Sequence, residues 1–109
     1  TGYNLSAGGP IVNPKAQLIV LTPICPHTLN ARSIILAAED EIEIEISAGR
    51  EGQKQQVEVS FDGTNVISMG IGDRVRIVKS EKTTEIIQIN RVSFLEVLHK
   101  KMSDKDSVK

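Results

Sequence analysis

Hydrophobic and polar residues alternate strictly over residues 41–46, which read Glu-Ile-Glu-Ile-Glu-Ile. Successive side chains of a strand point to opposite faces, so this pattern predicts a strand with its isoleucines on one buried face and its glutamates in water. Residues 57–61 alternate in the same way, and residues 49–54 between the two segments contain the glycines of a turn. We therefore expect 41–46 and 57–61 to pair as a hairpin.

Turn residues separate several further segments that resemble strands. Asp62-Gly63 is a tight-turn dipeptide, and Gly70-Ile-Gly-Asp73 marks another turn. Residues 17–21 are apolar almost throughout, which predicts a strand buried on both faces. The other segments with strand character are 33–37, 65–69, 74–79 and 83–90. Short strands joined by such turns indicate an antiparallel sandwich or barrel.

The opening residues predict a short helix. Gly2 to Ala7 fit one or two helical turns, with Thr1 as the N-cap and Gly8 as a left-handed C-cap, and Pro10 cannot continue the helix. The open end of such a helix suits a phosphate or a ribose, and its small side chains let a ligand approach the backbone closely. Tyr3 adds a flat face with a polar tip. An ordinary capped surface helix is the alternative reading.

A second helix is predicted near the other end of the chain. Ser93 and Glu96 have the spacing of a capping box, and apolar residues at helical spacing follow as far as Met102. Residues 103–109 are charged and predict a tail. The expected fold class is therefore mainly β, an antiparallel β-sandwich with a short N-terminal helix and a C-terminal helix, in a single domain of residues 1–102.

Composition narrows the classes of function. The chain has 109 residues, which is the size of one domain, and its formal net charge is −1. A charge so close to zero gives no electrostatic case for nucleic acid or for an anionic membrane surface. The single cysteine excludes an internal disulfide and fits the reducing cytosol, so a cytoplasmic location is expected. We find no signal peptide and no apolar run long enough to cross a membrane.

Four ordered motifs carry a resemblance to a known family. The run Thr-Gly-Tyr-Asn-Leu-Ser-Ala-Gly-Gly-Pro-Ile-Val over residues 1–12 resembles the NAD kinase pattern Thr-Gly-Ser-Thr-Ala-Tyr-Ser-Leu-Ser-Ala-Gly-Gly-Pro. The likeness continues through Leu-Thr-Pro-Ile-Cys-Pro-His-Thr-Leu at 21–29, Phe-Asp-Gly at 61–63 and Phe-Leu-Glu-Val-Leu at 94–98. The resemblance implies the C-terminal part of a longer kinase, because the upstream Gly-Gly-Asp-Gly loop and Asn-Glu pair of the family are missing.

The resemblance also implies which residues bind the dinucleotide. In the family, the Thr-Ala-Tyr of the motif lies along the dinucleotide, a serine one turn later reaches the same side, and a loop isoleucine lines the site. Asp62-Gly63 resembles an Asp-Gly turn near the family's pocket, although a hairpin turn is an equally good reading. The expected NAD-binding residues are Thr1, Gly2, Tyr3, Ser6, Ile24 and Thr64.

Other reactive residues favour structural roles. The prolines at 23 and 26 predict a rigid irregular loop, in which His27 is expected to be hydrogen-bonded scaffolding or to line the substrate. Cys25 has no partner acid, base or thiol nearby in sequence, so we expect a buried, inert thiol. The glutamates of 41–45 and the basic residues of 74–79 are expected on solvated strand faces. Two histidines and one cysteine, widely separated, predict no metal site.

The activity that the resemblance implies is transfer of the ATP γ-phosphate to the 2′-hydroxyl of the adenosine ribose of NAD, which gives NADP. The family's catalytic aspartate, a divalent metal such as Mg²⁺ with ATP, and an N-terminal α/β domain all belong to residues upstream of this chain. The chain itself is expected to bind NAD and to form a homo-oligomer, either a dimer or a tetramer. Two alternatives remain open: a non-catalytic β-sandwich interaction module, and a small oligonucleotide-binding barrel. This sequence disfavours the barrel because it lacks the aromatic stacking surface and the net positive charge that such modules use.

Overall fold

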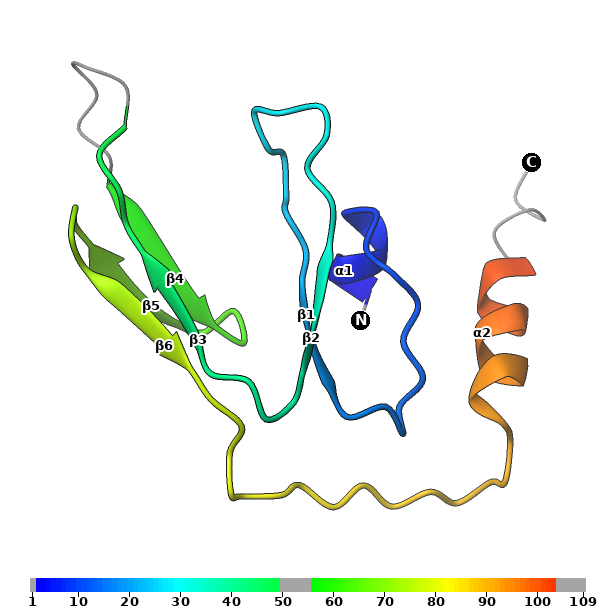
Figure 1. Ribbon diagram of the computed structural model, residues 1–109. Helices are drawn as coiled ribbons and strands as arrows, with labels where there is room; N and C mark the ends of the chain where they lie inside the picture. The colour runs from blue at the N-terminus through cyan, green and yellow to red at the C-terminus, as the bar shows by residue number, and fades with distance from the viewer. Residues whose placement is uncertain (1, 50–55, 104–109) are drawn as a thin grey trace. The chain divides into compact units, whose positions relative to one another are not determined.

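The computed structural model describes residues 2–49 and 56–103. Its elements are α1 (Gly2–Ser6), β1 (Leu18–Leu21), β2 (Ile34–Ala37), β3 (Ile42–Glu45), β4 (Val57–Phe61), β5 (Asn65–Met69), β6 (Arg74–Ile77) and α2 (Phe94–Ser103), as Figure 1 shows. Contacts within the chain place α1, β1, β2 and α2 in one unit and β3 to β6 in another. Every described strand pairs antiparallel, in three two-stranded sheets.

Helix α1 ends where the sequence predicts. Gly8 has a φ of 81°, the left-handed conformation that closes a helix, and its amide donates to the carbonyl of Leu5 at 3.1 Å. The amide of Gly9 donates to the carbonyl of Asn4 at 2.8 Å. These two hydrogen bonds form a Schellman motif, which satisfies carbonyls that the end of the helix leaves free. The predicted C-cap is confirmed, whereas Thr1, the predicted N-cap, lies outside the described residues.

Strands β1 and β2 form an antiparallel hairpin in the same unit as α1. Leu18 pairs with Ala37 and Leu21 with Ile34, so the apolar segments predicted at 17–21 and 33–37 are both confirmed as strands. The four residues of β1 are half-buried rather than buried on both faces as predicted. Among the described strands β1 pairs with β2 alone, so it is an edge strand, and edge strands are more accessible than strands flanked on both sides. The residues between the strands include the irregular loop predicted at 22–27.

The sequence predicts the wrong partner for β3. Residues 41–46 do contain a strand, but β3 pairs with β6 and not with 57–61. Opposite charges supply the reason, because Glu43 lies opposite Arg76 and Glu45 opposite Arg74, whereas residues 57–61 offer Glu58 and no cation. Of the turn predicted at 49–54, only Gly49 belongs to the described residues.

The apolar face of β3 is only partly covered. Ile42 is buried, Ile46 is half-buried and Ile44 is exposed. Across the sheet, Ile42 pairs with Ile77 and Ile44 with Val75, so the apolar residues of both strands share one face, as alternation predicts. The predicted common face is therefore confirmed, but full burial of its isoleucines is not observed in this unit.

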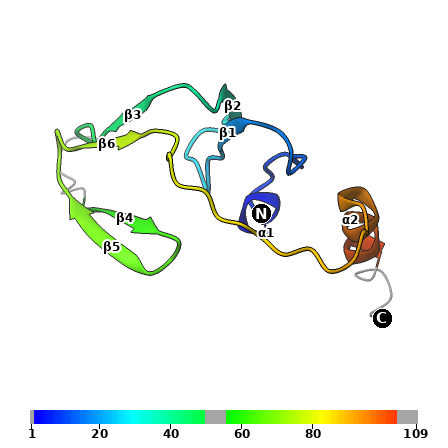
Figure 2. The ribbon, with the colours of Figure 1, turned by 90° about the horizontal axis from the view of Figure 1, so that it is seen from below.

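Strand β4 pairs with β5 through the turn predicted at Asp62-Gly63. Asp62 has a φ of 50° and Gly63 a φ of 73°, and the amide of Thr64 donates to the carbonyl of Phe61 at 3.1 Å. Positive φ at both central residues is the requirement of a type I′ turn, which Asp-Gly meets with little strain. Figure 2 shows β4 and β5 joined by this turn, and the strands predicted at 57–61 and 65–69 are confirmed.

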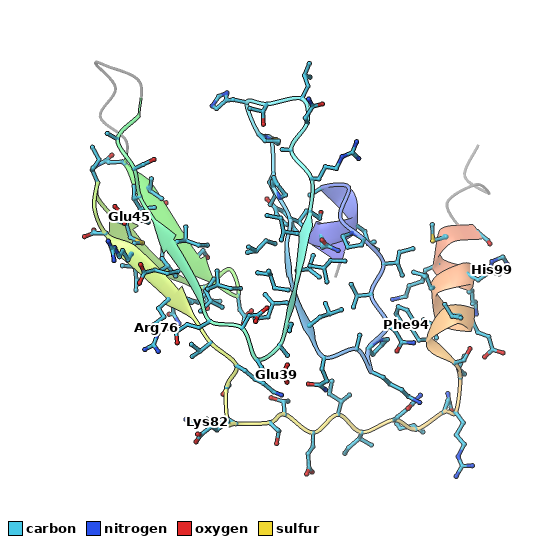
Figure 3. The ribbon with its side chains drawn as sticks, viewed as in Figure 1. Glu39, Glu45, Arg76, Lys82, Phe94 and His99 are labelled. Carbon is cyan, nitrogen blue, oxygen red and sulfur yellow. The ribbon has the colours of Figure 1, made fainter. Side chains whose placement is uncertain are left out.

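The segment 83–90 does not form the strand that its sequence predicts. Among the described residues no segment pairs with it, and Ile86, Ile87 and Ile89 are 88%, 89% and 91% exposed. A run rich in isoleucine favours an extended backbone, but a strand also needs hydrogen-bonding partners, and no described segment supplies them. Figure 3 shows this part of the chain as an extended trace, with Lys82 near its start.

Helix α2 begins with the predicted capping box. The amide of Glu96 donates to Ser93 Oγ at 3.2 Å, and the amide of Ser93 donates to Glu96 Oε2 at 3.0 Å. These reciprocal bonds satisfy two free amides at the start of the helix. The helix extends to Ser103, one residue beyond the predicted end, so Ser103 belongs to the helix and not to the tail predicted at 103–109. Residues 104–109 lie outside the described part of the chain.

The fold class predicted from the sequence is confirmed: antiparallel strands dominate, with a short helix first and a longer helix last. The boundary of a single domain at residues 1–102 stays a prediction. Neither helix in the described ranges is long and apolar enough to cross a membrane.

Candidate functional site

A hollow of about 470 Å³ opens beside α1. Its lining comes from three stretches that are separate in sequence: the helix with the turn after it, the strand β1, and the loop after β1. The lining residues are Tyr3, Asn4, Ala7, Pro10, Val12, Leu18, Val20, Thr22 and Ile24. The volume lies within the range of small-molecule sites, and the mixture of many apolar groups with a few polar ones is also typical of such sites.

Two residues predicted to bind NAD meet at this hollow. Tyr3 comes from α1 and Ile24 from the loop after β1, and both line the same space. Tyr3 is 73% exposed and Ile24 is 49% exposed, so both side chains remain available to a ligand. A phenol ring and an aliphatic side chain on the same hollow can hold a flat ring, while the phenol hydroxyl hydrogen-bonds a sugar hydroxyl.

The lining of the hollow carries no ordinarily charged side chain. None of its lining residues is a carboxylate, a histidine, a lysine or an arginine. Among residues 2–49 and 56–103, no three His, Cys, Asp or Glu side chains gather closely enough to hold a metal ion. The arrangement can therefore bind and orient a ligand by contact and by hydrogen bonding.

A chain of side-chain hydrogen bonds holds the helix against the strands. Thr22 Oγ1 donates to Asn4 Oδ1 at 2.5 Å, and Asn4 Nδ2 donates to the carbonyl of Pro10 at 2.8 Å. Ser33 Oγ donates to Thr22 Oγ1 at 3.4 Å, which is long for a bond between hydroxyls. These hydrogen bonds link α1 to the end of β1 and to the start of β2. The family resemblance implies that the stretch from Thr22 to Cys25 lines the site, but sequence reasoning identified neither Asn4 nor these hydrogen bonds.

Gly9 leaves the space that Asn4 occupies. A Cβ built on Gly9 would lie inside the Asn4 carboxamide and 2.8 Å from Thr22 Oγ1. Gly8, by contrast, has open space at its Cβ position, and its positive φ explains the choice of glycine. The glycine pair thus serves two purposes: the first residue closes the helix, and the second makes room for the Asn4 side chain.

A second, smaller hollow of about 350 Å³ lies in the same unit. Its lining residues are Ala7, Gly8, Pro10, Pro23, Ala31, Arg32, Ser33 and Ile35. It shares Ala7 and Pro10 with the first hollow, so the two border each other at the end of α1 and the turn that follows it. Arg32 is the cation among its lining residues.

The other predicted site residues either do not line the 470 Å³ hollow or lie outside the described residues. Gly2 and Ser6 belong to α1 and are exposed, but neither lines the 470 Å³ hollow. Thr64 belongs to the unit that contains β3 to β6, where its hydroxyl donates to the carbonyl of Phe61 at 3.3 Å, as expected of a turn residue. Thr1 lies outside the described residues. The roles of these four residues in binding stay predictions.

The loop after β1 differs from expectation at Cys25. The thiol was expected to be buried, but Cys25 is exposed and has a φ of 47°. The prolines at 23 and 26 keep this loop out of regular structure, but a residue before proline favours an extended backbone, so they do not account for the positive φ of Cys25. His27 is also exposed and does not line either hollow. The expectation that His27 lines the substrate or acts as scaffolding stays a prediction.

The charged residues of β3 and β6 form ion pairs on a solvated face, as the alternation predicts. Arg74 contacts Glu43 at 3.0 Å and Glu45 at 2.9 Å, and Arg76 contacts Glu41. Figure 3 shows Glu45 and Arg76 on this sheet. The hydrogen bond from Arg76 lowers the pKa of Glu41 below its usual value, and the same bond raises the pKa of Arg76. These groups pair with one another, so they do not form a paired-carboxylate site.

The fold and the hollow define an antiparallel β domain whose small-residue helix borders a ligand-sized, uncharged cavity. A family model described as ATP-NAD kinase C-terminal domain matches residues 1–89. The chain belongs to this family.

Curated relatives agree with this assignment. The NAD kinase of Lachnoclostridium phytofermentans is 45% identical over 105 residues, which are 96% of this chain and 37% of that protein. The NAD kinase of Agathobacter rectalis is 46% identical over 104 residues, 95% of this chain and 37% of the relative. The chain therefore spans little more than a third of the length of these relatives.

A solved structure has the same arrangement of elements. The crystal structure of yeast NADH kinase complexed with NADH matches with a TM-score of 0.75 and 28% sequence identity. The match covers 100% of this chain and 34% of the yeast chain. The antiparallel fold with its flanking helices is thus shared with that kinase.

Proposed function

We propose that this chain is the acceptor-binding part of an NAD kinase, in which the dinucleotide lies in the hollow beside Tyr3. The complete protein would transfer the γ-phosphate of ATP to the 2′-hydroxyl of the adenosine ribose of NAD and release NADP. One observation carries the proposal: α1 and the loop after β1 bring Tyr3 and Ile24, two residues singled out by the family motif, to the same uncharged hollow.

The chemistry of the hollow suits the acceptor rather than the donor. Phosphoryl transfer requires in-line positioning, cations to offset the charge of the phosphates, and a base for the attacking hydroxyl. The lining contains none of these cations or bases, but it can hold a flat ring and hydrogen-bond a sugar. The ATP site, the Mg²⁺ that accompanies ATP, and the catalytic base therefore belong to the α/β part of the protein outside this chain.

Within this chain, the proposed ligand contacts divide by type. The Tyr3 ring stacks on the ligand, its hydroxyl and that of Ser6 bond ribose, and Ile24 closes the apolar side. Thr1 and Gly2 complete the proposed contact set, and Gly2 leaves room where the family usually has alanine. The support for this set is the position of Tyr3 and Ile24 on the hollow and the exposure of Gly2 and Ser6 on the same helix.

Assembly into a homo-oligomer, a dimer or a tetramer, and a cytoplasmic location complete the proposal. The hairpin of β4 and β5 supports an oligomer, because its register places apolar side chains together on one face, and two of them, Phe61 and Ile67, are exposed. A second copy of the chain is the partner we propose for that face. Sedimentation equilibrium of the complete protein should give a mass of two or four subunits, and a monomer at micromolar concentration would contradict this part.

An activity assay tests the main proposal. The complete protein should form NADP from NAD and ATP in the presence of Mg²⁺, and the 109 residues alone should form none, since they lack the donor site. A complete protein that binds NAD but forms no NADP would contradict the kinase assignment. A complete protein that neither binds NAD nor forms NADP would favour the alternative of a non-catalytic interaction module.

A further inference from the structure

We propose that Asn4 is a positioning residue that fixes Tyr3 against the dinucleotide by tying α1 to the strands. The inference rests on the proposed function, since it concerns how that binding site is held. Asn4 follows Tyr3 in the helix and lines the same hollow. No residue predicted from the motif to bind the ligand has this role.

The helix is too short to hold Tyr3 in place unaided. Helix α1 has five residues and buries none of them. Isolated helices of this length are unstable in water, so tertiary contacts must fix the direction in which α1 points. The contacts that Asn4 makes are of this kind, because they join the helix to Pro10 in the turn after it and to Thr22 at the end of β1.

The direction of these hydrogen bonds specifies an amide at position 4. The carbonyl of Pro10 can only accept, so it must receive the bond from Asn4 Nδ2, which leaves Oδ1 to accept from Thr22. The Thr22 hydroxyl has one proton and gives it to Asn4, while it accepts the longer bond from Ser33. Every group in this series of hydrogen bonds thus has one defined orientation, and the Asn4 side-chain amide supplies both a donor and an acceptor.

Gly9 shows that this arrangement has its own space. A Cβ on Gly9 would occupy the position of the Asn4 carboxamide, so glycine at 9 and asparagine at 4 fit as a pair. The φ of Gly9 lies outside the left-handed range that favours glycine. Room for the Asn4 side chain is therefore the reason that the structure gives for glycine at position 9.

The test is a kinetic comparison in the complete protein. Asn4→Ala should raise the KM for NAD about fivefold to tenfold, as expected for loss of a tie that orients the ligand contact, and leave the KM for ATP within about twofold. Thr22→Val removes only the hydroxyl and should raise the KM for NAD in the same direction. Because both variants break the same bond, the double variant should show less than the product of the two single effects.

Asn13→Ala is the matched control. Asn13 also uses its amide oxygen to accept a backbone hydrogen bond, from the amide of Lys15 at 2.9 Å, but it lies in an exposed turn and lines neither hollow. This variant should leave both KM values unchanged. If Asn4→Ala does not fold, Thr22→Val, which keeps the side-chain shape, carries the test.

Three outcomes would overturn the inference. An unchanged KM for NAD in folded Asn4→Ala or in Thr22→Val would show that the bond does not orient the ligand contact. Equal increases in the KM for NAD and for ATP would indicate a general loss of structure. If the unmutated protein bound no NAD, the proposed function would fail and the inference with it. If the unmutated protein bound NAD and the variants kept its KM for NAD, the inference alone would fail.

Discussion

Replacing Gly9 by alanine perturbs the centre of the candidate site with a single methyl group. The added Cβ would overlap the Asn4 carboxamide and approach Thr22 Oγ1 to 2.8 Å, so the Asn4 side chain must leave its position. Its bonds to Pro10, at 2.8 Å, and from Thr22, at 2.5 Å, would then be lost or distorted.

The expected cost follows from these contacts. Each of the two hydrogen bonds contributes about 0.5–1.5 kcal/mol, and crowding adds about 1–3 kcal/mol where the surroundings cannot relax. Alanine restricts the unfolded chain more than glycine does. This stabilises the folded protein by about 0.4–1 kcal/mol and offsets part of the cost. Since the Asn4 contacts are only partly buried, the lower part of each range applies. We expect Gly9→Ala to reduce the free energy of unfolding by about 1–3 kcal/mol.

Two neighbouring glycines provide controls in the same urea titration. Gly2→Ala has open space around its Cβ and lies in the helix, so it should stabilise the protein by about 0.5–1 kcal/mol. Gly8→Ala also has open space, but its φ of 81° should cost about 1–2 kcal/mol. Only the penalty at Gly9 should shrink when Asn4 is already alanine. A Gly9→Ala variant as stable as the unmutated protein, or a penalty unchanged in the Asn4→Ala background, would refute the reasoning.

Three further predictions concern elements away from the hollow. Ser93→Ala removes one half of the capping box and should cost about 1 kcal/mol of helix stability, measured by amide exchange in α2, without affecting NAD binding; unchanged exchange would contradict the cap. Gly63→Ala places a Cβ on a residue with a φ of 73° and should cost about 1–2 kcal/mol in thermal unfolding, whereas no loss would argue against the type I′ turn. Because its bond to Arg76 lowers the pKa of Glu41, the pair stabilises the folded state above the unfolded pKa of about 4.3, and this contribution disappears as pH falls through the lowered pKa. The stability difference between Glu41→Gln and the unmutated protein should therefore be present at neutral pH and vanish in acid, and a difference independent of pH would contradict the assignment.

Local signals in the sequence were enough for most of the elements. Gly8 after a run of small residues predicts the end of α1, Ser93 with Glu96 predicts the start of α2, and Asp62-Gly63 predicts the turn between β4 and β5. Each of these depends on hydrogen bonds between residues that are close in sequence, so the pattern contains the information needed.

Pairing between distant strands was harder to predict. Alternation over 41–46 indicates a strand and the face that it buries, but not its neighbour. The glutamates of β3 and the arginines of β6 match in register, and that charge complementarity could have identified the partner. For 83–90 no such signal helps, since a strand forms only where an edge is available and no described segment provides one.

The candidate site was predicted in part. The family motif led to Tyr3 and Ile24, which the structure brings to the same hollow. It did not lead to Asn4 or to the hydrogen bond that Asn4 accepts from Thr22, because these two residues are 18 positions apart in the sequence. The prediction that Cys25 is buried was wrong for a related reason. The exposure of a loop residue depends on the path of the whole loop, and the two prolines indicate only that this loop is irregular.

The central claim is that the hollow beside Tyr3 binds the dinucleotide, and calorimetric titration of the complete protein with NAD tests it most directly. Stacking of a ring on an aromatic side chain contributes about 1–3 kcal/mol, so Tyr3→Ala should weaken NAD binding about tenfold or more while ATP binding stays unchanged. Equal NAD affinity of the unmutated protein and Tyr3→Ala, with both proteins folded, would contradict the account.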